Sequence, residues 1–134
     1  MADLYGDYIL EHALNPNHWG ILLPADAEYE TNNPLCGDNL RLTVRFDKHE
    51  RITALGWDGK SCAITLAAAS MLGEKILGKT PDELRMIRKQ DIFDMLDISL
   101  SMNRVNCALL PFKVFTIALY GVEAWEKYED DAEE

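Results

Sequence analysis

A single change of hydrophobic period divides the chain and limits the folds open to it. From Leu40 to Asp47, apolar and polar residues alternate, which is the period-2 pattern of a half-buried strand. From Ala63 to Leu77 the chain is apolar almost all round and rich in small residues, which predicts a buried, closely packed helix. Strands followed by helices are typical of an α+β fold.

Further segments complete the predicted fold. We expect two more strands, at residues 28–33 and 52–57, with a polar turn at residues 47–50. Thr80, Pro81 and Glu83 have the spacing of a helix start, with a cap, a proline in the first turn and a glutamate three residues after the cap. The result is a small three-stranded antiparallel sheet with helices packed mainly on one face. The predicted helices cover residues 5–14, 63–77, 81–89, 92–96 and about 109–119, the last with Pro111 in its first turn.

Composition fits one domain that folds around an ordinary core. The 134 residues are 48% hydrophobic and 27% charged, and we assign residues 1–125 to the domain and the acidic residues 126–134 to a disordered tail. The formal net charge of −10 argues against nucleic-acid binding, which needs basic side chains at the phosphates. The sequence contains no apolar run long enough for a membrane span and no signal-peptide pattern at its start, so we expect a cytoplasmic protein with no membrane partner.

Three cysteines carry the candidate chemistry: Cys36, Cys62 and Cys107. Their odd number and wide spacing argue against a framework of disulfide bonds. Each falls at a predicted boundary: the first between two strands, the second before the buried helix and the third just before the last helix. A helix N-terminus favours the thiolate, which is the form that binds metals and attacks sulfur.

Asp38 lies two residues after Cys36, so one turn could aim a carboxylate and a thiolate at the same point. Gly59 could let the backbone approach a bulky ligand. Three sulfur donors and one oxygen suit zinc or an iron–sulfur centre, although incidental core thiols remain an alternative interpretation. The three histidines are expected to be structural or solvated, with the first at a helix surface: His12, His18 and His49.

Several segments together resemble the U-type iron–sulfur cluster scaffold family, which includes IscU, SufU and the N-terminal domain of NifU. The resemblance runs from Leu4 to about Tyr120. It is carried by the opening helix with Asn15-Pro16 and by three cysteine motifs, at residues 33–38, 59–65 and 104–113.

The resemblance implies a scaffold or carrier rather than an enzyme. Cys36, Asp38, Cys62 and Cys107 would hold iron, zinc or a transient [2Fe–2S] cluster. Either Cys107 or Cys36 would accept persulfide sulfur from a cysteine desulfurase. Apo iron–sulfur client proteins would then receive the cluster, and a homodimer could hold it.

Departures from the family pattern leave two other functions open. Asn106 stands where Isc-type scaffolds carry a histidine, and residues 101–105 hold no proline, so the family's chaperone site does not carry over. The chain also lacks the SufU-type insertion between the second and third cysteines. One alternative is a zinc-dependent sulfurtransferase. The other is a non-catalytic interaction module stabilised by zinc.

Overall fold

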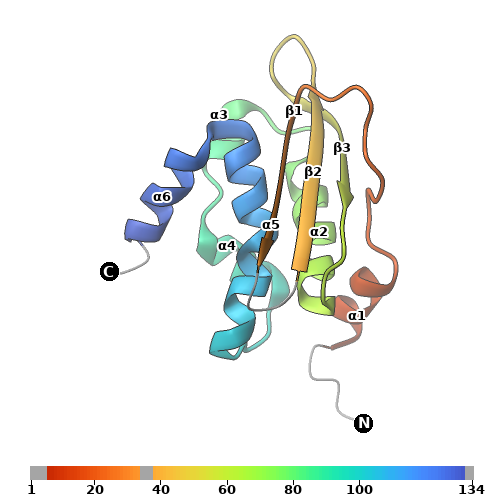
Figure 1. Ribbon diagram of the computed structural model, residues 1–134, viewed down its shortest axis with the longest axis vertical. Coiled ribbons are helices and arrows are strands. Elements are labelled where there is room, and N and C mark those ends of the chain that lie inside the picture. The colour runs from red at the N-terminus through yellow and green to blue at the C-terminus, as the bar shows by residue number, and fades with distance from the viewer. Residues whose placement is uncertain (1–5, 34–37, 132–134) are drawn as a thin grey trace.

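The computed structural model describes residues 6–33 and 38–131. One antiparallel sheet has the strand order β1-β2-β3, and helices lie behind it (Figure 1). The predicted α+β fold is therefore confirmed. The strands are β1 (Ala27–Asn33), β2 (Asp38–Phe46) and β3 (Ile52–Asp58), and the helices are α1 (Gly6–Leu14), α2 (Ala63–Ile76), α3 (Pro81–Arg85), α4 (Lys89–Leu96), α5 (Met102–Tyr120) and α6 (Val122–Asp131).

The core lies between the sheet and the two long helices α2 and α5. Leu40, Leu42 and Val44 alternate along β2 with their side chains wholly buried, and Trp57 on β3 pairs with Leu42 in the register. A strand sends successive side chains to opposite faces, so the alternation in the sequence specifies which residues meet the helices. Burial also explains why α2 is apolar almost all round, because ten of its residues are buried.

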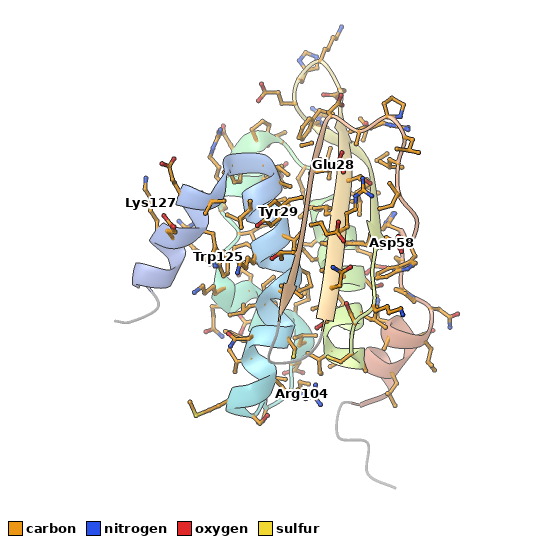
Figure 2. The ribbon with its side chains drawn as sticks, viewed as in Figure 1. Glu28, Tyr29, Asp58, Arg104, Trp125 and Lys127 are labelled. Atoms are coloured by element: carbon orange, nitrogen blue, oxygen red, sulfur yellow. The ribbon has the colours of Figure 1, made fainter. Side chains whose placement is uncertain are left out.

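The opposite face of the sheet carries charge. Glu28 on β1 accepts a hydrogen bond from Nε of Arg41 on β2 at 3.0 Å. This bond, together with the negative charge of Glu28, raises the pKa of the Arg41 guanidinium. Glu28 and Asp58 lie on this face in Figure 2. The sheet is thus apolar toward the helices and charged on its other side, as expected for an antiparallel sheet covered on one face.

The segment after α1 runs along the free edge of β3. Gly20 N donates to Trp57 O at 2.7 Å, and Trp57 N donates to His18 O at 2.9 Å. His12 anchors the preceding helix, because its Nδ1 lies 2.6 Å from the hydroxyl of Ser70 on α2. The sequence prediction of a surface His12 is wrong, since the residue is only 8% exposed. Its imidazole faces α2 rather than solvent.

The C-terminal half departs from the prediction at three places. The two helices predicted at 81–89 and 92–96 are present with other bounds, because the first ends at Arg85 and the second begins at Lys89. Helix α5 begins at Met102, before Cys107, so Pro111 lies inside it rather than in its first turn. Helix α6 extends through residues assigned to a disordered tail, because Trp125 packs on Phe112 and gives that segment an apolar anchor. None of the helices in the described ranges is long and apolar enough to cross a membrane.

Candidate functional site

Cys62 occupies the N-cap position of α2, as the sequence predicted. Its backbone is extended, its carbonyl accepts the first helical bond from Leu66 N at 2.9 Å, and its side chain does not cap the helix. The residue is partly exposed. The sulfur therefore lies beside the unpaired N–H groups of a 14-residue helix, where a negative charge is favoured.

A turn fastened to the start of β2 carries Cys62. Asn39 N donates to Lys60 O at 2.7 Å, and the Ser61 hydroxyl donates to Asn39 O at 3.2 Å. Gly59 has φ of +129° and lies so close to β2 that a Cβ atom there would be 2.0 Å from Asn39 O. The sequence predicted that Gly59 lets a ligand approach the backbone closely. In the structure, the group that approaches Gly59 closely is the backbone of Asn39. These contacts hold the Cys62 turn beside the segment that follows Asp38.

Cys107 lies in the second turn of α5 and is fully buried. Its predicted position just before the last helix is wrong. The sequence argument placed Pro111 in a first turn because an interior proline removes one helical hydrogen bond. In the structure, the missing helical hydrogen bond is the one that an N–H at position 111 would donate to the Cys107 carbonyl. A donor from another helix bonds to that carbonyl instead.

Thr65 on α2 is that donor, and it joins the two cysteine segments. Its hydroxyl donates to Cys107 O at 3.0 Å, and the oxygen of this hydroxyl lies 3.5 Å from Cys62 Sγ. Thr65 is completely buried. Since residues three apart lie on the same side of a helix, the first turn of α2 presents Cys62 and Thr65 together toward α5. The structure therefore brings the second and third cysteine motifs together.

The remaining predicted ligands are only partly described. Cys36 lies outside the described residues, and of Asp38 only the backbone, at the first position of β2, is described. Within the described ranges, no group of three or more His, Cys, Asp or Glu side chains is arranged to hold a metal ion. The four-residue site accordingly stays a prediction, with two of its segments placed at the same end of the molecule as the start of β2.

Two basic residues flank Cys107 along the chain. Arg104 and Lys113 are both half-buried on α5, three residues before and six residues after the cysteine. Figure 2 shows Arg104 at the end of the molecule where α5 begins. Asn106 is exposed. Arg104 thus lies within one helical turn of Cys107 in the sequence of α5.

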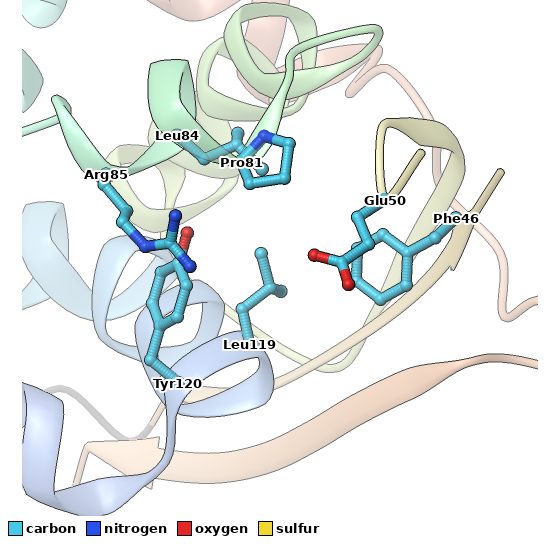
Figure 3. Close-up of a pocket in the computed structure, with 7 residues that line it drawn as sticks. All are labelled: Phe46, Glu50, Pro81, Leu84, Arg85, Leu119 and Tyr120. Carbon is cyan, nitrogen blue, oxygen red and sulfur yellow. The ribbon is translucent and has the colours of Figure 1, made fainter. Parts of the chain in front are cut away.

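A shallow hollow of about 290 Å³ lies at the far end of the molecule, near the turn between β2 and β3. Figure 3 shows Arg85 beside the ring of Tyr120 on one side and Glu50 near Phe46 on the other. Arg85 lies 5.7 Å from the centre of the Tyr120 ring, a cation–π distance. The hollow contains no cysteine and is separate from the candidate site.

Sequence reasoning missed Thr65 and Asn39 as residues that organise the site. Asn39 holds the Cys62 turn through its backbone N–H and carbonyl, and those groups leave no signal in a sequence. Thr65 did leave a signal, because a β-branched hydroxyl residue interrupts an otherwise small and apolar helix three positions after a cysteine.

The Cys62 sulfur is of the kind that binds a soft metal or cluster. The Cys62 sulfur is not used to cap its helix, and the fixed first turn of α2 holds it next to the Cys107 segment. Thiolates are the ligands that zinc and iron–sulfur clusters prefer. Fold and site together define a class: a small α+β domain that places two cysteine segments at one end of a helix-covered sheet.

Comparison with known proteins identifies the family. Residues 4–128 match the family described as the NifU-like N-terminal domain. The zinc-dependent sulfurtransferase SufU of Bacillus subtilis (strain 168) is 30% identical over 127 residues, which cover 82% of this chain and 85% of that protein. The structure of FiSufU from the thermophile Fervidobacterium islandicum AW-1 has a TM-score of 0.76 at 27% identity, covering 87% of this chain and 96% of that one. The chain belongs to the NifU-like N-terminal domain family.

Another relative aligns over a shorter segment. The iron–sulfur cluster assembly scaffold protein IscU of Streptococcus pyogenes serotype M1 is 36% identical over 80 residues, which cover 60% of this chain. The chain spans about half of that relative, 49% of its length. The resemblance to IscU, SufU and NifU found in the sequence motifs is thereby confirmed.

Proposed function

We propose that this protein is an iron–sulfur cluster assembly scaffold that receives sulfur from a cysteine desulfurase and iron, builds a [2Fe–2S] cluster and transfers it to apo-proteins. Cys36, Asp38, Cys62 and Cys107 are the proposed ligands. Family membership supports the scaffold function. The observation that carries the site is the contact of Thr65 with both Cys62 and the Cys107 carbonyl, which brings two cysteine motifs to one place.

Sulfur transfer needs no added oxidant or reductant. The thiolate of Cys36 or Cys107 attacks the outer sulfur of the desulfurase persulfide, a new S–S bond forms, and the desulfurase thiolate leaves with the electron pair. Cys107 is fully buried, so this role would require the segments that cover it to open. The mixed donor set suits cargo that must leave, because the carboxylate of Asp38 is a harder and poorer partner for iron–sulfur chemistry than a fourth thiolate.

A zinc-dependent sulfurtransferase is the second candidate. The Bacillus subtilis relative bears that name and aligns over most of both chains. The same four residues would hold the zinc, and zinc would keep the thiols deprotonated. One thiolate, once released by a desulfurase, would then take the sulfur.

Anaerobic reconstitution separates the two functions. Wild type, Cys62→Ser and His49→Ala are incubated with iron, sulfide and stoichiometric zinc, and iron, acid-labile sulfide and zinc are measured per chain. His49 is the control, because it is a possible ligand that lies exposed in the turn between β2 and β3. A scaffold should show matched iron and sulfide in wild type and His49→Ala and lose both in Cys62→Ser.

Other results would change the conclusion. Tightly bound zinc without sulfide would favour the sulfurtransferase, and activation of a desulfurase by the zinc-loaded protein would then be the deciding assay. A normal cluster on Cys62→Ser would contradict the proposed ligand set.

A further inference from the structure

The Cys107 carbonyl needs a donor from outside its own helix. In an α-helix the N–H four residues later would supply the hydrogen bond, and in α5 that residue is Pro111, which has no N–H. Cys107 is wholly buried, and a buried carbonyl left without a donor destabilises the fold. The hydroxyl of Thr65 supplies the missing donor at 3.0 Å.

The same hydroxyl oxygen also lies 3.5 Å from the Cys62 sulfur, and since its one proton goes to the Cys107 carbonyl, it can only accept from the Cys62 thiol. Thr65 lies in the first turn of α2, three residues after Cys62 at the N-cap position, so the geometry of the hydroxyl depends on the start of that helix. A single buried oxygen is therefore in contact with the sulfur of one proposed ligand and with the main chain of another. Any shift of α2 against α5 at this level would change both contacts together.

We infer that Thr65 is the positioning residue of the proposed metal or cluster site: its hydroxyl ties the Cys107 turn of α5 to the first turn of α2, beside the Cys62 sulfur. The inference rests on the proposed function, and it adds a residue that binds no metal itself. Groups that orient metal ligands in this way change metal affinity by about 10–100-fold when they are lost. The hydroxyl, rather than the volume of the side chain, is the feature that acts.

Three variants separate these contributions. Thr65→Val keeps the branched shape and removes the hydroxyl, whereas Thr65→Ser keeps the hydroxyl. Thr43→Val is the matched control, because Thr43 is also fully buried, donates to Gly56 O at 3.1 Å and accepts from Leu22 N at 3.0 Å, but lies on the charged face of the sheet. It removes a comparable pair of hydrogen bonds away from the cysteines.

The measurements are Zn²⁺ affinity, by competition with a chromophoric chelator, and the visible absorption of the Co²⁺-loaded protein, which reports ligand geometry. Circular dichroism checks that each variant is folded. Thr65→Val should bind Zn²⁺ about 10–100-fold more weakly and show shifted Co²⁺ bands. Thr65→Ser should recover the wild-type affinity and spectrum, and Thr43→Val should keep both even if its melting temperature falls.

Wild-type affinity and spectrum in Thr65→Val would overturn the inference, and so would an equal loss of affinity in Thr43→Val. If Thr65→Val does not fold, Thr65→Ala replaces it in the comparison with Thr65→Ser. Equal Zn²⁺ affinities of Thr65→Ala and Thr65→Ser would likewise overturn the inference. A wild-type protein that binds neither Zn²⁺ nor Co²⁺ would instead contradict the proposed site as a whole. The wild-type titration alone distinguishes that failure from the failure of Thr65 as its positioning residue.

Discussion

Gly59 is the residue on which the position of the Cys62 turn most depends. Its φ of +129° is one that other residues rarely adopt, and a Cβ atom would lie 2.0 Å from Asn39 O. Backbone strain of this kind costs about 1–3 kcal/mol, and the contact with a backbone oxygen adds to it. We expect Gly59→Ala to lower the free energy of unfolding by more than the strain alone, measured by urea denaturation, and to weaken Zn²⁺ binding.

Gly20 offers a matched control for that substitution. Its φ is +123°, close to that of Gly59, but nothing lies within 4 Å of the place a Cβ would take. Gly20→Ala should therefore show the strain without the clash and leave Zn²⁺ affinity unchanged. Equal losses of stability in the two variants would mean that the contact with Asn39 contributes nothing.

At the scale of elements, the sequence predicted what local pattern determines. Alternation located β2, and the Thr80-Pro81-Glu83 spacing located the start of α3, where the capping box is present. The start of α5 could not be predicted, because the group that compensates for Pro111 is a threonine 46 positions earlier in the chain. The position of Cys62 was predicted correctly because the start of α2 depends on neighbouring residues. The position of Cys107 was predicted wrongly because α5 depends on a residue far away in the sequence.

Among the side chains of α6 that the structure describes, Trp125 is the only buried one. Trp125 is 6% exposed, meets Phe112 edge to face at 5.8 Å and has Lys89 Nζ 5.0 Å from its ring centre. Acidic residues dominate the rest of the segment, which is why its composition resembled a tail. Trp125→Ala should cost up to about 3–5 kcal/mol and abolish hydrogen-exchange protection in α6.

A substitution on the exposed side of the same helix provides the comparison. Val122 is 50% exposed, so Val122→Ala should change stability by less than about 0.5 kcal/mol and leave the exchange of α6 amides unaltered. Persistent protection of α6 in Trp125→Ala would show that other contacts hold the helix.

At the scale of the whole molecule, one continuous apolar core joins the sheet to the helices. The sheet, α2 and α5 contribute fully buried apolar side chains to one continuous cluster, and Trp57, Phe112 and Leu72 are among them. Each such side chain contributes about 1.5–3 kcal/mol when buried. A zinc-stabilised module would depend on its metal much more strongly.

We therefore expect the protein to stay folded after metal removal. The urea midpoint and the far-ultraviolet circular dichroism are measured before and after treatment with EDTA. The chelated protein should keep a cooperative transition, with a lower midpoint only to the extent that bound metal had stabilised the native state. Loss of the transition on chelation would favour the interaction-module alternative.

The join between the Cys62 turn and β2 is made by the main chain of Asn39, and this has a consequence for sequence drift. The amide N–H and carbonyl at position 39 are present in almost every amino acid, so these two bonds do not restrict the side chain there. Proline alone is excluded, because it lacks the N–H that bonds Lys60 O. A position essential to the architecture can therefore look unconstrained in an alignment, whereas its partner Gly59 should not.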